Sequence, residues 1–333
     1  MPEAWRLKRM DSAQNLEAQP EPIHFLVFNG FSMLGLFSAM EPLRVANQLR
    51  KDLYSWHFMS LDGQPVKASN GMDFNVDHSI EGVSGLPTLF ICAGFTPERF
   101  CTPEFLSWLR ARAADSSLLG GIDTGSVILA KAGLLKGYRA TVHWEHLAAF
   151  REDFLEVKVT GSLFEIDRNR FTSSGGTSSL DLMLQLISLK HGYDLAVQVS
   201  EQLIHERIRE PHDDQRMPIS LRLQIHHPKL IKIIEIMENH LDTPMSIDTL
   251  AERLELSSRQ ISRIFRDNLD ISPGQFYLKL RLDKAQQLLS QTSMPVLDVA
   301  LACGFSSNAA FTKAYKTLFN LTPRQERHQG HRD

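Results

Sequence analysis

Two residues could act together in chemistry at a turn between a strand and a helix. The stretch "GGIDTGSVILA" reads as an apolar strand, a sharp turn at "DTG" and an amphipathic helix, and His143 follows in "RATVHWE". Such a turn raises the side chain at its tip beside backbone N–H groups that can hold an oxyanion. The tip residue is Asp123, so the pattern indicates either an active site with an unusual nucleophile or an elbow retained for another use.

The composition is that of a globular protein with room for two domains. The chain has 333 residues, of which 43% are hydrophobic, and no apolar run approaches the length of a membrane span. No secretion signal is recognisable at the N-terminus, so we expect a cytoplasmic protein. Cys92, Cys101 and Cys303 are scattered without metal-ligand spacing, which predicts free thiols, with Cys92 in a buried strand.

The charge is unevenly distributed along the chain. The formal net charge is −3, which by itself argues against a nucleic-acid-binding protein. Residues 221–333, however, hold 15 Lys and Arg against 12 Asp and Glu, whereas the rest of the chain holds 21 against 27. This asymmetry predicts a C-terminal part with a function of its own.

The elements that position these residues follow two different patterns. After a polar tail at 1–21, which we expect to be disordered, apolar strand patterns alternate with helical patterns over residues 22–205. This predicts an α/β fold with a flavodoxin-like parallel sheet sandwiched by helices. Residues 206–227 are polar and charged, as in an interdomain linker, and residues 228–330 show helical patterns only, which predicts an all-α domain.

The all-α part contains a weak internal repeat of residues 247–268 in residues 296–318. Each copy reads as a helix, a tight turn held by Glu255 or Gly304, and a second helix capped by Ser, which is the arrangement of a helix-turn-helix unit. Asp270 and Asn320 follow the second helices and are expected in the left-handed conformation. The alignment sets Ser257-Ser258 on Ser306-Ser307 and inserts one residue later in the second copy.

The second helix of each copy would enter the major groove of DNA with its outward side chains on base edges and phosphates. Arg can grip guanine and Asn or Gln adenine, whereas Lys316 would mainly hold phosphate. The candidate DNA-binding residues are Ser258, Arg259, Gln260, Ser262, Arg263 and Arg266 in the first copy, and Ser306, Ser307, Asn308, Ala309, Thr312, Lys313 and Lys316 in the second.

These residues resemble the AraC/XylS family of bacterial transcription regulators. The helix between the two copies carries the family's "RL..A..LL", which matches Arg281, Leu282, Ala285, Leu288 and Leu289. The resemblance implies two recognition helices that read successive major-groove segments of double-stranded DNA, joined by a rigid helix. One departure is that Asp270 and Asn320 replace the glycine that usually precedes "SP" or "TP".

The first part resembles the class I glutamine amidotransferase-like superfamily, which includes the intracellular cysteine proteases. The resemblance is carried by "HFLVFNGFSMLGLFSAMEPLRVAN", "LFICAGF", "GGIDTGSVILAKAGLLKGYRATVHWE" and "FTSSGGTSSLDLMLQLI". Superfamily enzymes have Cys at the position of Asp123, His at that of His143, and an acidic residue that would fall near Gly35. The nearest carboxylate here, Glu41, lies almost two helical turns further along, so we expect no catalytic residues and no enzyme activity.

What the resemblance implies is a ligand pocket at the carboxyl ends of the strands. Asp123 would present a carboxylate there beside His143 and Trp144, and a carboxylate with an indole face favours a cationic or quaternary ammonium group. The alternative is that Asp123 only caps its helix and that Trp144 belongs to the core.

Glycines at a second helix start complete the expected pocket. Backbone N–H groups around Gly175, Gly176 and Thr177 could receive a carboxylate from the same ligand, unless the glycines serve the turn alone. Asp181, one turn further along, is expected on the helix surface.

Both resemblances occur together in one subgroup of regulators, in this order along the chain. Its members commonly control catabolism of arginine, glycine betaine, carnitine or related N-methylated amino acids. The subgroup implies an effector-responsive transcription activator that binds a small zwitterion, without cofactor or metal, and acts with RNA polymerase as a homodimer. Two other readings stay open: a hydrolase or amidotransferase fused to a DNA-binding module, and a constitutive DNA-binding protein without a ligand.

Overall fold

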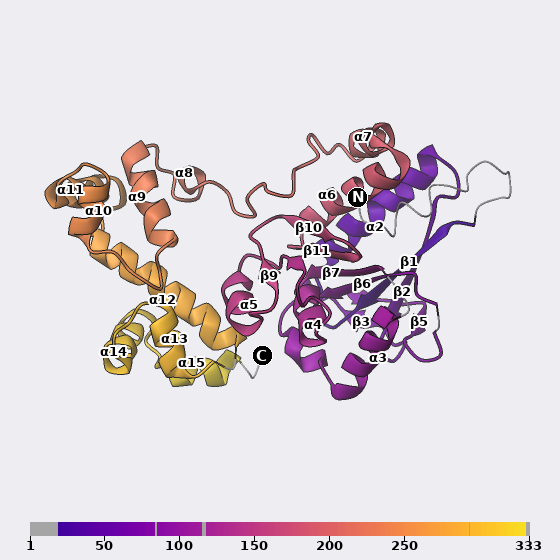
Figure 1. The fold of residues 1–333 in the computed structure, drawn as a ribbon, viewed down its shortest axis with the longest axis horizontal. Helices are drawn as coiled ribbons and strands as arrows, with labels where there is room; N and C mark the ends of the chain where they lie inside the picture. Colours follow the sequence, from indigo (N-terminus) through magenta and orange to yellow (C-terminus); the bar gives the residue numbers. More distant parts are fainter. Residues whose placement is uncertain (1–18, 84, 115–117, 293, 331–333) are drawn as a thin grey trace. The chain divides into compact units, whose positions relative to one another are not determined.

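The computed structural model describes residues 19–83, 85–114, 118–292 and 294–330 (Figure 1). The contacts divide the chain into two compact units, and the division falls between Gln215 and Arg216. Of the tail predicted at 1–21, residues 1–18 lie outside the described residues, and Glu21 already belongs to the first strand, β1 (Glu21–Val27). Within the described ranges, no helix is both long enough and apolar enough to cross a membrane.

The first unit is built on a seven-stranded sheet with the order β10-β11-β7-β6-β1-β2-β5. Every neighbouring pair is parallel except the antiparallel pair of β10 and β11, so the predicted mostly parallel sheet is confirmed. The strands are β1 (Glu21–Val27), β2 (Tyr54–Ser60), β5 (His78–Ser79), β6 (Thr88–Ala93), β7 (Leu118–Asp123), β10 (Phe164–Asp167) and β11 (Arg170–Ser173).

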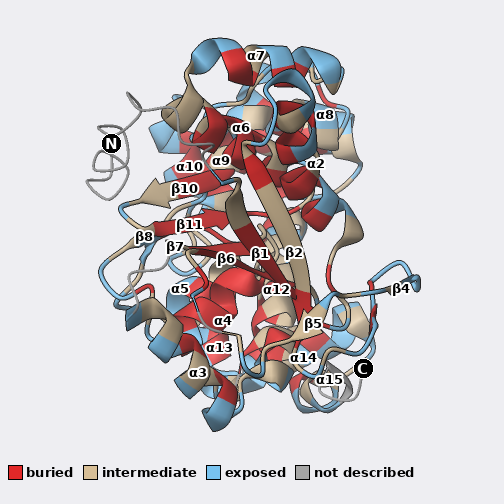
Figure 2. Ribbon diagram, turned by 90° about the vertical axis from the view of Figure 1, so that its right-hand side faces the viewer, coloured by how far each residue is buried: buried red, intermediate tan, exposed pale blue. Residues whose placement is uncertain are grey.

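Helices cover both faces of this sheet because successive side chains of its strands point to opposite faces. On one face, Phe25, Phe90 and Phe171 pack against α2 (Met33–Leu49), α6 (Ser178–His191) and α7 (Tyr193–Gln202). On the other, Leu26 and Leu89 pack against α3 (Pro103–Ala114), α4 (Gly125–Lys131) and α5 (Leu147–Asp153). Figure 2 shows the buried strands between the two helical layers. Cys92 is buried within β6, as predicted, and all three cysteines are free thiols.

The segment expected as a linker, residues 206–227, divides between the two units. Residues up to Gln215 belong to the first unit, whereas Ile219 in the short helix α8 (Ile219–Arg222) and Ile225 join the core of the second. Asp181, expected on a helix surface, is fully buried, because Arg209 supplies an ion-pair partner for its carboxylate and His205 Nε2 lies 3.0 Å from the same carboxylate.

The second unit is helical throughout its described residues, which confirms the all-α prediction. Its helices are α8, α9 (Pro228–Glu238), α10 (Ile247–Arg253), α11 (Ser258–Leu269), α12 (Pro273–Gln291), α13 (Val296–Ala302), α14 (Asn308–Phe319) and α15 (Pro323–Gly330). The four turn and end positions are left-handed as expected, with φ of 54° at Glu255, 73° at Gly304, 52° at Asp270 and 58° at Asn320.

One detail of the repeat alignment is wrong. Ser257 caps α11 and Ser307 caps α14, so Ser257 is equivalent to Ser307 and not to Ser306. The inserted residue therefore lies inside the turn of the second copy, between Gly304 and Ser307, where a turn accommodates an extra residue without disturbing either helix.

Candidate functional site

The turn at Asp123 has the shape of a strained elbow. Asp123 adopts φ of 58°, a conformation that costs energy for any residue with a side chain. Close approach explains the glycines around it: a Cβ added to Gly125 would come within 1.9 Å of the Ile91 carbonyl oxygen. A Cβ added to Gly121 would lie 2.7 Å from the backbone nitrogen of Ser126. The hydroxyl of Thr124 donates to the carbonyl of Gly94 and ties the elbow to β6.

A cavity of about 150 Å³ opens at this elbow. Asp123 and His143, which the sequence predicts to meet, both line it. The other residues that line it are Gly30, Ser32, Ser69, Gly94, Phe95, Thr124, Glu145 and His146. The volume suits a molecule smaller than a typical drug, for which pockets measure roughly 300–1,000 Å³.

Burial sets the protonation of the groups around the cavity. Burial raises the pKa of Asp123 to about 7. The hydrogen bond from the Thr124 backbone acts in the opposite direction and lowers this pKa, whereas the charge of Glu145 raises it. Burial lowers the pKa of His143, and it lowers that of His146 to about 4. The two imidazoles are therefore neutral near pH 7, whereas Asp123 is divided between its two forms.

Four of the predicted ligand residues, Trp144, Gly175, Gly176 and Thr177, are not in the lining of this cavity among the described residues. Trp144 stands beside His143, with ring centroids 5.6 Å apart, but does not line the cavity among the described residues. Thr177 is drawn away, since its hydroxyl accepts from Arg209 Nη2 at 2.8 Å. Gly176 has left-handed φ of 53° and faces open space.

Gly175 is in direct contact with the elbow although it does not line the cavity. Its φ is 83°, and a Cβ added to it would lie 2.8 Å from the Cβ of Asp123. The glycine therefore serves both the turn and the space that Asp123 occupies.

No carboxylate of α2 supports Asp123. The position expected for the acidic partner, Gly35, lies against Ile122, with 3.3 Å between an added Cβ and Cγ2. Glu41 forms a surface ion pair with Arg44 at 2.8 Å. The arrangement therefore lacks the thiol and the acidic group of the superfamily's enzymes at these two positions.

Sequence reasoning missed Phe95, Glu145, His146, Ser32 and Ser69. Four of them lie close in sequence to elements or residues at the cavity. Phe95 follows β6, Ser32 caps α2, and Glu145 and His146 follow His143. The carboxyl ends of β1 and β6 could have indicated Ser32 and Phe95, because parallel strands end at one edge of the sheet, whereas Glu145 and His146 follow neither strand. Ser69 carries no such signal.

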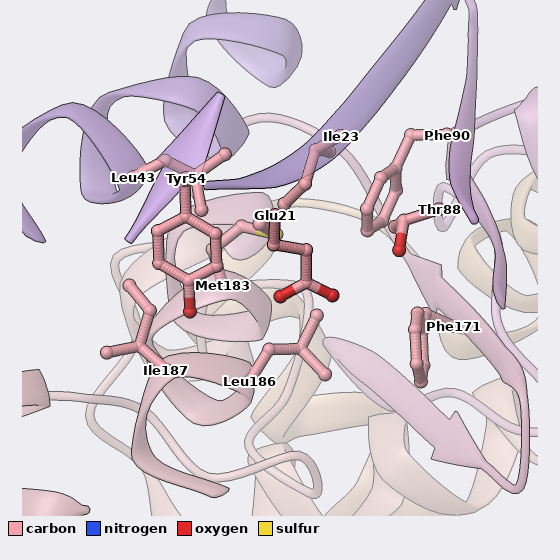
Figure 3. A pocket seen from close by; sticks show the side chains of 10 residues that line it. All are labelled: Glu21, Ile23, Leu43, Tyr54, Thr88, Phe90, Phe171, Met183, Leu186 and Ile187. Carbon is pink, nitrogen blue, oxygen red and sulfur yellow. The ribbon is translucent and has the colours of Figure 1, made fainter. Parts of the chain in front are cut away.

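A second cavity lies at the opposite ends of the strands, around Glu21 (Figure 3). Apolar side chains such as Phe90, Phe171 and Leu186 surround it, and the Glu21 carboxylate pairs with Lys190. Its volume of about 20 Å³ has room for one water molecule and excludes an effector.

The two candidate recognition helices, α11 and α14, repeat the same burial. Ile261 and Phe265 of α11 are buried, and so are Phe311 and Tyr315 of α14. The basic side chains predicted to meet DNA are all exposed: Arg259, Arg263, Arg266, Lys313 and Lys316. Ser306, Asn308 and Ala309 are exposed as well.

Several of the smaller candidates already hold the helix starts. Gln260 accepts from the backbone N–H of Ser257 in a capping box, and the Ser307 hydroxyl accepts from Ala310. The Ser258 hydroxyl donates to Asp248, and that of Ser262 to the carbonyl of Ser258. Thr312 donates to Asn308 at 3.3 Å.

The helix α12 explains the "RL..A..LL" pattern. Arg281 donates to the carbonyls of Cys303 and Gly304 at 2.8 and 2.7 Å, so it satisfies the end of α13 and the turn that follows. Leu282, Ala285, Leu288 and Leu289 are buried. The pattern therefore fixes the second helix-turn-helix unit onto the connecting helix.

Comparisons with known proteins match both units. Residues 22–189 match the DJ-1/PfpI family, and residues 250–329 match a helix-turn-helix domain family. The chain is 51% identical to the HTH-type transcriptional regulator CdhR of Pseudomonas aeruginosa over 91% of this chain and 90% of that one. It is 46% identical to the HTH-type transcriptional regulator GbdR of the same species, over 92% and 84%.

A solved structure gives the same relationship for the first unit. An AraC family transcriptional regulator from Pseudomonas putida is 31% identical, with a TM-score of 0.52, over 55% of this chain and all of that one. Since the relatives match nearly their whole length, the match includes both units and their order. The chain belongs to the AraC-type transcriptional regulators that join a DJ-1/PfpI domain to a DNA-binding helix-turn-helix domain.

Proposed function

We propose that the protein is a transcription activator whose first unit binds a small zwitterion with a cationic nitrogen, such as glycine betaine or carnitine. The observation that carries this proposal is the lining of the elbow cavity. Among the described residues, it contains the carboxyls of Asp123 and Glu145 and the ring of Phe95, but neither Lys nor Arg. A cavity with acidic groups and an aromatic ring favours a cationic group.

The other half of the zwitterion finds hydroxyl groups in the same lining. Ser32 and Ser69 supply hydroxyl donors, and Ser32 already accepts from the backbone N–H of Gly35, which leaves its hydroxyl hydrogen for a ligand carboxylate. Asp123, His143 and the neighbourhood of Gly175 remain the proposed ligand residues. Trp144, Gly176 and Thr177 would act indirectly.

A pair of isosteric ligands tests recognition of the cation. Glycine betaine and 3,3-dimethylbutanoate have nearly the same shape, but only the first carries a positive charge. Calorimetry on the full chain should show glycine betaine binding at least about tenfold more tightly than this isostere, which keeps the carboxylate but lacks the cation; the difference is about 1.4 kcal/mol. Asp123→Asn should remove this preference, whereas Asp194→Asn, on the exposed surface of α7, should retain it. Equal binding of the two isosteres would contradict the proposal.

We propose further that the first unit does not catalyse a reaction. Support comes from the absence of a thiol at the elbow and from Glu41 being engaged with Arg44. Incubation with the bound amine, followed by mass spectrometry, should return the amine unchanged. Turnover by the wild-type chain that Asp123→Asn abolishes would favour the competing reading of a hydrolase fused to a DNA-binding module.

We also propose that the regulator acts as a homodimer with RNA polymerase and that α11 and α14 read the operator. Residues 216–333, the whole second unit, should then bind operator DNA without a response to the amine when expressed alone. Full regulation in cells by that fragment would instead favour a constitutive DNA-binding protein.

A further inference from the structure

Residues 205–215, which we call the strap, lead from the end of α7 to the boundary with the DNA-binding unit. One end of the strap is bonded to Asp181 of α6. His205 Nε2 lies 3.0 Å from Oδ1 of Asp181, and the Arg209 backbone donates to the same oxygen at 2.8 Å. Arg209 Nε and Nη2 donate to Oδ2 at 2.9 and 2.6 Å. Because a buried carboxylate needs such partners, Asp181 fixes this end of the strap.

The bonds between the strap and Asp181, which we call the Asp181 clasp, are connected to the effector cavity through the start of α6. Arg209 Nη2 also donates to the Thr177 hydroxyl at 2.8 Å. The backbone and the hydroxyl of Ser178 donate to the carbonyl of Gly175 at 3.2 and 2.7 Å. Gly175 in turn lies against the side chain of Asp123. A ligand that moves Asp123 therefore acts on Gly175 and on the turn that Arg209 holds.

The other end of the strap is bonded to the chain that carries His143. Gln215 Nε2 donates to the Thr141 hydroxyl at 3.0 Å, to the Val142 carbonyl at 3.1 Å and to the Ser162 carbonyl at 2.8 Å. Val142 immediately precedes His143, which lines the cavity. The strap therefore contacts the turn that lies against Asp123 and the residue next to His143, both of which adjoin the cavity without lining it.

The hydrogen bonds of Gln215, which we call the Gln215 clasp, are accompanied by an energetic penalty. The Oε1 of Gln215 is buried and has no hydrogen-bond partner among the described residues. A buried acceptor without a partner destabilises the arrangement that contains it, so release of Gln215 recovers part of that cost. The Gln215 clasp is therefore suited to break when the chain at Val142 and His143 moves.

We propose that Asp181 and Gln215 are positioning residues that couple the effector cavity to the strap. The inference rests on the proposed effector function. Ligand contacts with Asp123 and His143 act on the adjoining Gly175 and Val142, and the bonds of Asp181 and Gln215 pass the change to the strap, which continues directly into Arg216 of the second unit. The coupling requires that the ligand binds one arrangement of the strap more tightly than the other.

Gln215→Ala tests the coupling in the full chain because it removes the amide that donates to Thr141, Val142 and Ser162, while Thr141 and Ser162 still bond to each other at 2.7 Å. With glycine betaine or carnitine as the probe, the variant should keep its amine affinity within about threefold. The change in operator affinity caused by the amine, roughly 5- to 150-fold in a typical coupled system, should fall below about twofold. The matched control is Gln198→Ala, an exposed glutamine of α7, which should respond like the wild type.

Hydrogen exchange gives a second readout that a purely structural role would not change. The backbone N–H of Arg209 and of Leu163, which donate to Asp181 and to the Pro211 carbonyl, should change their exchange rates by at least about threefold when the amine binds. Amine binding with unchanged exchange, and a full response of Gln215→Ala, would overturn the coupling alone. Absence of binding by either amine would overturn the proposed effector, and the coupling with it.

Discussion

The Cα of Gly175 faces the side chain of Asp123 so closely that an added Cβ would lie 2.8 Å from the Cβ of Asp123. Two segments far apart in the sequence, the elbow after β7 and the turn before α6, therefore share one site. The contact explains why the "SSGGT" turn belongs to the site even though its helix start is not part of the cavity lining.

Gly175→Ala should displace Asp123 and weaken amine binding by at least about tenfold. The new methyl group would clash with the Asp123 side chain. The alanine would also have to keep the left-handed φ, which costs about 1–2 kcal/mol in its own right. Gly176→Ala is the matched control, since its φ of 53° is also left-handed but nothing lies within 4 Å of the added Cβ. Calorimetry and thermal unfolding of both variants separate the two effects: equal loss of affinity in both would mean that strain, not contact with Asp123, is responsible.

Amine binding should strengthen as the pH rises through about 7. Burial raises the pKa of Asp123 to about 7 from its ordinary value of 3.8, so the carboxylate that attracts a cation forms only near and above neutral pH. His146 stays neutral in this range, because burial lowers its pKa to about 4, and burial lowers the pKa of His143 as well. Between pH 6 and pH 8, the affinity for glycine betaine should rise about tenfold, and Asp123→Asn should abolish the rise.

The same residue gives a stability effect of defined sign. Because the folded-state pKa of Asp123 is raised, its contribution to stability is fully present below pH 3.8 and is lost as the pH rises through about 7. Asp123→Asn should therefore be more stable than the wild type at pH 8 and lose this advantage toward pH 4. All four tryptophans lie before residue 145, so their fluorescence reports on unfolding of the first unit.

The elements could be predicted from the sequence better than the contacts between them. Apolar runs such as that of β6 and the Ser-capped helices α11 and α14 have local signals, and both were predicted. The burial of Asp181 has none: a carboxylate on a helix reads as exposed until a distant segment supplies Arg209 and His205. The membership of Glu145 and His146 in the cavity likewise depends on how the loop after β8 (Arg139–Ala140) folds back on the elbow.

Lys316→Ala should weaken binding to all DNA sequences about equally. An exposed lysine on α14 that neutralises one phosphate should lower the slope of log affinity against log salt by about 0.9. Arg263→Ala in α11 should instead cost about 1–3 kcal/mol mainly on the preferred operator. Titrations at several salt concentrations distinguish the two, with Lys232→Ala of α9, paired to Glu235, as the control. A base-specific loss at Lys316 would contradict its assignment to phosphate.

The turns of the two helix-turn-helix copies should differ strongly in how far stability changes when their left-handed residues are exchanged. Gly304 has φ of 73°, and an added Cβ would lie 2.4 Å from Pro244 Cδ and 2.8 Å from the Leu241 carbonyl oxygen. Gly304→Ala should therefore destabilise the second unit by at least about 2 kcal/mol, through backbone strain together with overpacking against a rigid ring.

Glu255 occupies the equivalent turn with φ of 54° and is exposed. In Glu255→Gly, the relief of strain is offset by the greater freedom of glycine in the unfolded chain, so stability should change by less than about 1 kcal/mol. Because no tryptophan lies in this unit, hydrogen exchange of the amides in α10 to α14 is the measurement that resolves the difference. If Gly304→Ala lowered the stability of the second unit by less than about 1 kcal/mol, the contact with the loop at Leu241 and Pro244 would not be what requires glycine in the second copy.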